Sequence, residues 1–147
     1  MPRLALAMIC LVIGAAPALA QSSSSAGARI CGWFSPAEIG KYLGAAVKAG
    51  EVNGPLDSQC QWVGQSDSSR TFISIQMVSA RHWEVPDQAD DFRRVKGVGD
   101  AAYVLPEFGG WKAAAKAGKE AVYVSGGGET LTAEKTLDLL RAALAHR

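Results

Sequence analysis

The sequence has few of the residues on which most catalytic and metal sites depend. Histidine occurs twice, as His82 and His146, and cysteine three times, as Cys10, Cys31 and Cys60. No Gly-x-Ser-x-Gly elbow is present, so no serine is marked by its sequence context as a nucleophile. The sequence therefore predicts no catalytic residue, no metal site and no cofactor.

A surplus of charge of either sign is also lacking. The chain has 15 Lys and Arg against 14 Asp and Glu, and residues 1–20 contain only Arg3 among them. Without those 20 residues each sign counts 14, and the net charge is about zero. Because nucleic acids and anionic lipids are attracted by clustered Lys and Arg, we expect no nucleic-acid partner.

The longest apolar run stands at the beginning of the chain. Arg3 supplies a basic start, residues 4–15 an apolar run and residues 18–20, Ala-Leu-Ala, a cleavage pattern. We interpret residues 1–20 as a secretory signal peptide cleaved near Ala20, and we expect a periplasmic or secreted protein. The run is shorter than the roughly 20 residues of a spanning helix, and no later segment approaches that length, so no transmembrane span is predicted. No cysteine stands at the cleavage point to carry a lipid.

Cleavage removes Cys10 and leaves Cys31 and Cys60. An even pair in an oxidising compartment predicts a disulfide between them. Closing a loop of about 30 residues would stabilise the fold by roughly 3 to 4 kcal/mol. The alternative, a pair of metal-binding or nucleophilic thiols, is disfavoured by the expected compartment.

Residues 21–29 are rich in serine and lack large apolar side chains. We expect them to form a flexible linker, followed by a single domain over residues 30–147.

Helix signals occur near both ends of the expected domain. Ser35, Pro36 and Glu38 form an N-cap, a first-turn proline and a capping box, and Gly44 is placed as a left-handed C-cap. A second helix is predicted after Thr132, with an apolar stripe at helical spacing made of Ala133, Leu137, Leu140 and Leu144.

Strand signals fill the region between the two helices. The clearest run is 71–79, which alternates between the apolar Ile73, Ile75 and Met77 and the polar Ser74 and Gln76. Because one face of this strand is wet, we expect an antiparallel sheet covered on one side only. The sequence predicts an α+β fold of about six antiparallel strands with an N-terminal and a C-terminal helix packed on one face. The strand segments expected are 45–52, 58–64, 71–79, a run ending near residue 106, 111–117 and 120–125.

The segment 81–96 breaks the alternation, and a short helix over residues 87–94 with Phe92 on its buried side is one interpretation. It carries the densest set of metal-ligand types in the chain, but their spacing matches neither a zinc motif nor a calcium loop. Because three arginines lie among these acids, we interpret the segment as a solvated loop with weak ion pairs. The set comprises His82, Glu84, Asp87, Asp90 and Asp91.

Two glycine-rich stretches lack the context of a phosphate loop. Residues 97–99 precede a strand and lack a third glycine, so a tight turn is predicted. Residues 126–128 precede a helix, but Glu129 would repel an anion there, and we interpret them as a flexible connection.

Taken together, the cysteine before the Ser-Pro-Ala-Glu helix, the Cys-x-Trp strand at residues 60–62 and the Gly-x-Gly-Asp-Ala-Ala-Tyr stretch at 97–103 form a pattern. This pattern resembles a family of small exported bacterial domains of unknown function, many of them lipoproteins. The resemblance covers Cys31 to about Leu144 and implies an envelope location, a disulfide and an α+β sheet. It assigns no catalytic residue, and this chain lacks the lipidation cysteine.

The four tryptophans provide candidates for a contact surface. We expect Trp62 to pack in the core and Trp33 to pack at the start of the first helix. Trp83 and Trp111 lie beside charged residues; core or half-buried packing is favoured for them, with partial exposure as the alternative. The interaction surface predicted from the sequence comprises Arg81, His82, Trp83, Arg93, Arg94 and Trp111.

Our hypothesis from the sequence is an exported, non-enzymatic module that binds an envelope protein or a small ligand through the wet face of the sheet and the loop 81–95. Two alternatives stay open. A carrier of an apolar ligand between sheet and helices would show a pocket lined by Tyr103 and Trp111. A hydrolase would bring His82, a carboxylate and a hydroxyl into one cleft. The sequence does not predict an oligomeric state.

Overall fold

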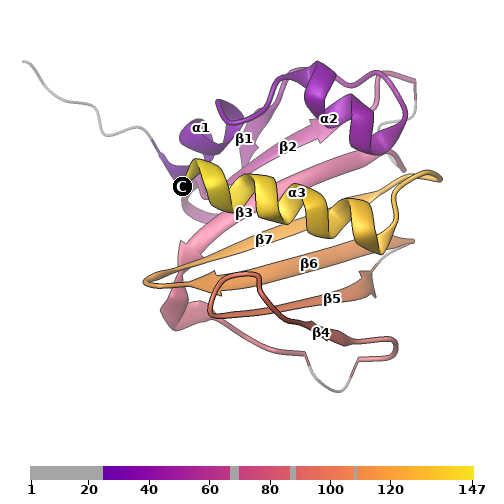
Figure 1. Cartoon of the computed structure of the whole chain (residues 1–147). Helices are drawn as coiled ribbons and strands as arrows, with labels where there is room; N and C mark the ends of the chain where they lie inside the picture. The colour runs from indigo at the N-terminus through magenta and orange to yellow at the C-terminus, as the bar shows by residue number, and fades with distance from the viewer. Residues whose placement is uncertain (1–24, 67–69, 87–88, 108) are drawn as a thin grey trace, which may run out of the picture.

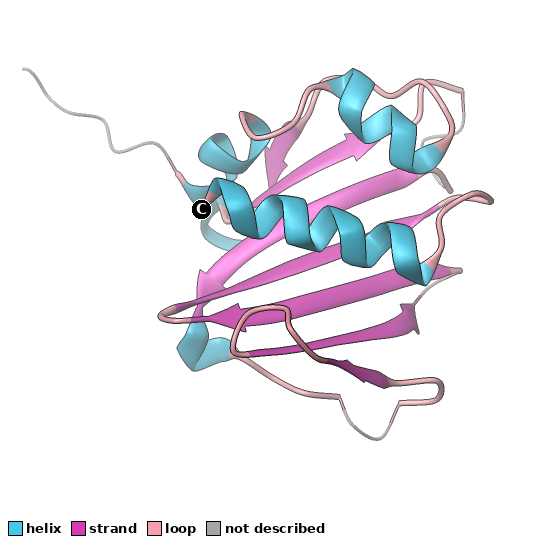
Figure 2. Cartoon of the chain, in the orientation of Figure 1, coloured by secondary structure: helices cyan, strands magenta, loops and turns pink. Residues whose placement is uncertain are grey.

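The computed structural model describes residues 25–66, 70–86, 89–107 and 109–147. The expected signal peptide and residues 21–24 of the expected linker lie outside this part of the chain. The described residues form an α+β fold with one antiparallel sheet and three α-helices (Figures 1 and 2).

The sheet has seven strands, one more than the sequence predicts. Two antiparallel meanders, β1-β2-β3 and β4-β5-β6-β7, join along β3 and β7, so that the last strand of each lies at the centre of the sheet. The spatial order is β1 (Glu51–Asn53), β2 (Gln59–Val63), β3 (Phe72–Ser79), β7 (Glu120–Gly127), β6 (Gly110–Ala117), β5 (Ala101–Glu107) and β4 (Arg93–Val95).

All three helices lie on the same face of the sheet, α3 across its centre and the other two over the β1-β2 side (Figure 1). The bounds are α1 (Ala26–Cys31), α2 (Pro36–Leu43) and α3 (Ala133–His146), with short 3₁₀ turns η1 (Pro55–Asp57) and η2 (Ala80–His82). The predicted α+β class and the placement of an N-terminal and a C-terminal helix on one face are therefore confirmed.

The capping box of α2 forms as the sequence predicts. The Glu38 backbone N donates to the Ser35 hydroxyl at 3.3 Å, and the Glu38 carboxylate accepts from the Ser35 backbone N at 2.8 Å. The bond from the Ser35 backbone N, and a second one from the Ser35 hydroxyl to the same carboxylate oxygen at 2.7 Å, lower the pKa of Glu38 because they favour its charged form. Gly44 ends the helix in the left-handed conformation, with φ of 63°.

The carbonyl groups at the end of α2 receive donors from the first turn of α3 and from the segment just before it. The Thr130 hydroxyl donates to the Leu43 carbonyl at 2.6 Å, and the Lys135 ammonium donates to the Tyr42 carbonyl at 3.3 Å. The last carbonyls of a helix have no partner within the helix, so these bonds fix the two helices to each other.

The core lies between the helices and the sheet. The predicted alternation of β3 holds, since Ile73 and Ile75 are fully buried and Met77 nearly so. After Trp111, β6 contributes only alanines to this face, which lets α3 lie close to the sheet. α3 buries a wider stripe than predicted, because Thr136, Leu139 and Ala143 are buried together with Ala133, Leu137 and Leu140.

The predicted disulfide is present. It joins Cys31 at the end of α1 to Cys60 in β2, with Cα atoms 5.2 Å apart and 29 positions apart in sequence. Cys60 and Trp62 are both fully buried on the helix-covered face, as their two-residue spacing predicts.

The expected flexible linker is wrong in its second half, because α1 begins at Ala26. The Ser25 hydroxyl caps the helix by accepting from the Ala28 backbone N at 3.2 Å. Gly27 lies so close to β2 that a Cβ there would come within 2.5 Å of the Gln59 carbonyl oxygen. Contact through a glycine, rather than through a large apolar side chain, explains why composition did not predict this helix.

Three other expectations are corrected. Residues 89–94 are not helical, and Arg93–Val95 form the edge strand β4, which pairs with Val104 to Ala102 of β5. The expected strand 45–52 is reduced to an isolated bridge at Val47 and the three residues of β1. Gly126 and Gly127 belong to β7 instead of forming a flexible connection. The turn at residues 97–99 forms as predicted, with positive φ at both glycines.

Candidate functional site

The face of the sheet turned away from the helices, here called the open face, has two unlike halves. Over β5 and β6, Tyr103, Leu105 and Ala114 are buried under Trp83, Ala89, Phe92 and Tyr123. We call this group the aromatic cluster. Over β3 and β7, the open face instead carries hydroxyl and amide side chains. The face predicted to be solvent-exposed is therefore polar only over β3 and β7, and the aromatic cluster covers it over β5 and β6.

The residues after β3 create this division. They cross the open face to reach β4 at the far edge of the sheet, and residues 80–86 form the first part of the crossing (Figure 1). The Tyr123 hydroxyl fixes them, donating to the His82 carbonyl at 3.2 Å and accepting from the Glu84 backbone N at 3.4 Å. Trp83 packs beside Tyr103 and Tyr123, with ring centroids 5.4 and 6.0 Å apart.

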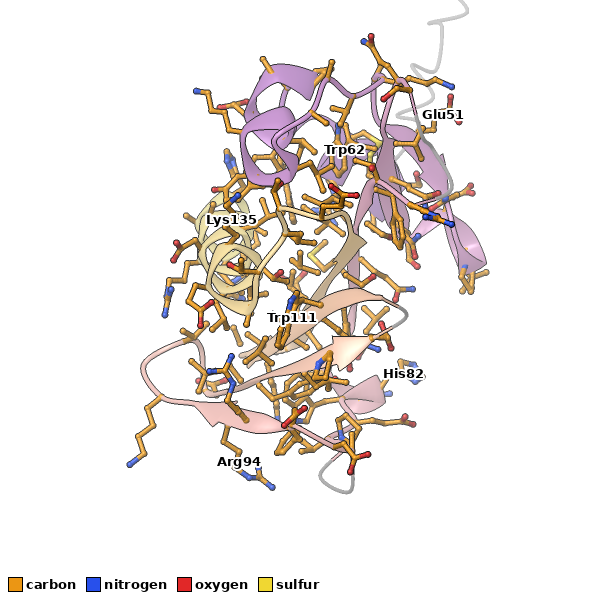
Figure 3. The ribbon with its side chains drawn as sticks, turned by 90° about the vertical axis from the view of Figure 1, so that its right-hand side faces the viewer. Glu51, Trp62, His82, Arg94, Trp111 and Lys135 are labelled. Atoms are coloured by element: carbon orange, nitrogen blue, oxygen red, sulfur yellow. A yellow bond between two sulfur atoms is a disulfide. The ribbon has the colours of Figure 1, made fainter. Side chains whose placement is uncertain are left out.

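A groove of about 360 Å³ lies beside this crossing, and we call it the open-face groove. Its floor consists of side chains from three central strands: Ser74, Gln76, Val78, Lys112, Tyr123 and Ser125. Its rim consists of Gln59, His82, Glu84, Pro86 and Tyr103. Figure 3 shows His82 on this side of the sheet, opposite the helix that carries Lys135.

The register of the paired strands determines which side chains are neighbours on the floor of the groove. Ser74 of β3 lies opposite Ser125 of β7, which lies opposite Lys112 of β6. In the neighbouring row, Gln76 lies opposite Tyr123. Two rows of polar side chains therefore cross the middle of the sheet side by side.

The single ammonium on the floor is already paired. Lys112 Nζ lies 3.2 Å from Glu107 Oε1 and 5.6 Å from the centroid of the Tyr123 ring. Both side chains of the ion pair are about one-quarter exposed. Because Glu107 offsets its charge, Lys112 does not give the groove a net positive charge.

The two phenols at the groove stay protonated at neutral pH. Burial raises the pKa of Tyr103 well above its ordinary value of about 10, and Tyr123, Glu107 and Glu84 raise it further. Burial also raises the pKa of Tyr123, against a smaller lowering by the hydrogen bond from the Glu84 backbone. Both hydroxyls are therefore donors.

Two residues that face the groove are nearly buried as a whole, but their hydroxyl oxygens stay accessible and lack protein partners. Ser74 is 6% and Tyr103 2% exposed, and neither hydroxyl hydrogen-bonds to another residue in the described ranges. Among the described residues, the buried side-chain polar atoms without a partner are Asn53 Oδ1 and Trp62 Nε1, and neither residue lines the groove. The Ser74 and Tyr103 hydroxyls are instead open to water or to a ligand. Gln76 Nε2 donates to the Ser58 hydroxyl at 3.0 Å, which holds its amide in place.

The residues of the predicted interaction surface do not share one face. Arg81 and His82 are exposed in η2, and Trp83 is half-buried in the aromatic cluster. The Arg94 guanidinium lies 5.5 Å from the centroid of the Phe92 ring, on the same side.

The two remaining residues of that surface lie on the helix-covered side. Arg93 lies 3.8 Å from Glu134 of α3, and Trp111 is half-buried against the main core. Figure 3 shows Trp111 on the side that faces the helices. Trp111 and Tyr103 therefore lie on opposite faces.

Sequence reasoning missed the floor of the groove as a site. The signal was present in the alternation of β3, which places Ser74 and Gln76 on the polar face. It did not show that Tyr123 and Lys112 would join them, because that depends on the pairing of β3 with β7, some 50 residues later in the chain.

The acidic segment gives no sign of a metal centre. Among the described residues, no group of three His, Cys, Asp or Glu side chains is placed to hold an ion, and Asp87 lies outside that set. His82, Glu84 and several hydroxyls do border one groove, the juxtaposition that the hydrolase alternative requires. In the described ranges, however, no hydrogen bond joins the His82 imidazole to a carboxylate or a hydroxyl.

In the part of the chain that the structure covers, no helix has the length and apolar character needed to cross a membrane.

The protein is therefore an α+β domain in which one face of an antiparallel sheet packs into the core and the other carries a polar groove. A scan against protein-family models, a search of curated proteins and a search of solved structures found no match to this chain.

Proposed function

We propose that this protein is an exported, non-enzymatic binding module that holds a small polar ligand in the open-face groove. The observation that carries the proposal is the pair of hydroxyls on the nearly buried residues Ser74 and Tyr103, which open onto the groove without protein partners. A bound polar molecule can take the hydrogen bonds that these accessible hydroxyls otherwise make with water.

The size and construction of the groove support this assignment. Its volume of about 360 Å³ is at the lower end of the range usual for small-molecule sites. Its floor belongs to β3, β7 and β6, three strands in the interior of the sheet, and so the polar groups stand on a rigid base. A preformed site costs little ordering entropy when a ligand binds.

The export part of the proposal rests on residues 1–20 and on the disulfide. A disulfide between Cys31 and Cys60 is compatible with an oxidising compartment such as the periplasm or the exterior. The likeness to exported envelope domains, carried by the motifs around Cys31, Trp62 and Tyr103, points the same way.

The test is a ligand screen monitored by NMR on the ¹⁵N-labelled, oxidised protein. The panel comprises neutral sugars, amino acids, dipeptides, carboxylic acids and amines. We expect at least one class to shift the backbone amide signals of Ser74, Gln76 and Ser125. Ser125→Leu, which fills the groove, should abolish these shifts, whereas Ser66→Leu at an exposed turn should retain them. If no class shifts these signals, or if Ser125→Leu leaves every shift unchanged, the proposal is wrong.

An envelope protein is the other occupant consistent with our hypothesis from the sequence. Affinity capture from envelope extracts distinguishes it, because Trp83 lies on the open side and Arg93 on the helix side. A protein partner that docks on the open face should be lost with Trp83→Ala and retained with Arg93→Ala. Loss with Arg93→Ala alone would move the contact to the other face.

A hydrolase remains the second candidate, because His82, Glu84 and Ser125 border the same groove. A general base acts on a nucleophile within hydrogen-bond reach, and the imidazole makes no such contact with a described residue. We expect chromogenic esters to be hydrolysed no faster by the protein than by His82→Ala. A rate that falls at least a hundredfold in His82→Ala would favour the enzyme.

The apolar carrier receives no support from the geometry. It requires a pocket lined by Tyr103 and Trp111, which lie on opposite faces of the sheet. The space between sheet and helices is occupied by buried side chains such as Trp62, Leu139 and Val124.

A further inference from the structure

We propose that the ligand of the open-face groove is a neutral saccharide of one or two sugar rings, an inference that rests on the binding function proposed above. It follows from four properties of the groove: the kind of polar groups on its floor, their charge, their position in the sheet and the apolar surface beside them.

Apart from Lys112, the polar groups on the floor are hydroxyls and the carboxamide of Gln76, with a second carboxamide, Gln59, on the rim. Ser74 and Ser125 are direct neighbours across β3 and β7, and Gln76 and Gln59 lie opposite each other on β3 and β2. Each of these groups both donates and accepts hydrogen bonds. A sugar hydroxyl also donates and accepts, so a ring with several adjacent hydroxyls can satisfy this set group by group.

The charges near the groove disfavour an ionic ligand. Glu107 pairs with Lys112, and so a carboxylate or phosphate would have to compete for the only ammonium on the floor. Glu84 on the rim would repel such an anion. No carboxylate lies on the described floor, so an ammonium group bound beside Ser74 and Ser125 would have only Glu84, on the rim, as a carboxylate among the lining residues.

The position of the floor disfavours an extended peptide. β3, β7 and β6 each have a strand on both sides, and so their backbone N–H and C=O groups are used within the sheet. Peptides that add to a sheet bind at an edge strand, where backbone groups are unpaired. The edges are β1 and β4, away from the groove, so recognition here must come from side chains.

Apolar surface borders the polar floor. Val78 on the floor and Pro86 on the rim offer aliphatic surface, and Tyr103 lines the groove beside them. A sugar ring has C–H groups as well as hydroxyls, and it can bury them here while its hydroxyls face Ser74 and Gln76. The volume of about 360 Å³ limits the ligand to one or two rings.

The test is a titration of the ¹⁵N-labelled, oxidised protein with neutral mono- and disaccharides, in parallel with glutamate, lysine, inorganic phosphate and triglycine. We expect the saccharides to shift the amide signals of Ser74, Gln76 and Ser125 at millimolar concentration. Ser74→Ala and Gln76→Leu should each weaken saccharide binding about tenfold, as expected for one lost hydrogen bond. Ser66→Ala, an exposed control, should bind as the parent does. The unfolding midpoint of each variant shows that it is folded.

The outcomes separate this inference from the proposed function. If glutamate, lysine, phosphate or triglycine shifts the groove signals and no saccharide does, the saccharide proposal is overturned while the binding function stands. If saccharides shift signals elsewhere, or bind Ser74→Ala and Gln76→Leu as tightly as the parent, the saccharide proposal is also overturned. If nothing in either panel shifts the groove signals, both are overturned.

Discussion

The two faces of the sheet are made from the same strands but differ in what covers them: helices pack on one, and the other carries the open-face groove. On β3, Ile75 is fully buried beneath the helices, whereas its neighbour Gln76 faces the groove. On the helix-covered face the large side chains pack against one another, and the Trp62 indole N–H is buried there without a hydrogen-bond partner among the described residues. On the open face, the hydroxyls of Ser74 and Tyr103 open onto the groove and hydrogen-bond to no described residue. One face is filled by packing within the fold, and the other presents polar groups that a ligand can reach.

The largest effect expected from this comparison concerns two tryptophans. Trp62→Ala removes a fully buried side chain from the helix-covered face and should lower the free energy of unfolding by about 3 to 5 kcal/mol. Trp83→Ala removes a half-buried ring from the aromatic cluster and should cost about 1 to 2 kcal/mol. Urea unfolding of both variants measures the difference. Equal losses would mean that the open face carries a core of the same importance.

The disulfide lies on the helix-covered face, and its loss should have the next largest effect on the free energy of unfolding. Reduction should lower the free energy of unfolding by about 3 to 4 kcal/mol, because the bond closes a loop with its ends 29 positions apart. Urea unfolding with and without reductant measures the loss. Thiol labelling of the oxidised protein under denaturing conditions should find neither Cys31 nor Cys60 free. A labelled cysteine would contradict the pairing.

A smaller effect distinguishes two phenols on the open face. Tyr123→Phe removes the hydroxyl that bonds His82 and Glu84, and should cost about 0.5 to 1.5 kcal/mol. Tyr103→Phe removes a hydroxyl with no partner in the described ranges and should leave the free energy of unfolding unchanged or raise it. Chemical denaturation of the two variants provides the measurement. A clear loss for Tyr103→Phe would show that its hydroxyl is already satisfied in the free protein.

The same phenols predict a modest loss of stability at alkaline pH. The folded-state pKa of Tyr103 is raised, so the unfolded chain loses this proton first, near pH 10. The stabilisation is fully present below about pH 10 and declines as the pH rises towards the folded-state pKa. Unfolding followed between pH 8 and 11 should show this decline, and Tyr103→Phe should show less of it. If the free energy of unfolding declines equally in the parent and in Tyr103→Phe, then Tyr103 is not the cause of the decline.

Local signals in the sequence predict much of the helix-covered face. The capping box at Ser35, the alternation of β3 and the pairing of Cys31 with Cys60 are each read from residues near one another or from a cysteine count, and each is confirmed. α1 is missed because it packs through Gly27, a contact that leaves no apolar pattern. β4 is missed because three residues are too few to show alternation.

The groove could be predicted only in part, because it depends on contacts between distant residues. The polar face of β3 is visible in the sequence, but its meeting with Tyr123 follows from strand register. The crossing of residues 80–86 is held by hydrogen bonds from Tyr123, about 40 positions away. The arginines and tryptophans chosen from the sequence were instead split between the two faces, as Trp83 and Trp111 show.

The most direct test of the difference between the faces measures folding and binding on one variant. The double variant Ser74→Ala, Ser125→Ala changes only the floor of the groove. Its free energy of unfolding should stay within about 1 kcal/mol of the parent, because Ser74 has no hydrogen bond to lose within the described chain. Its binding of the small polar ligands found by the NMR screen should fall by about tenfold or more. Unchanged binding, or a loss of stability as large as that of Trp62→Ala, would contradict the assignment of the open face to ligand binding.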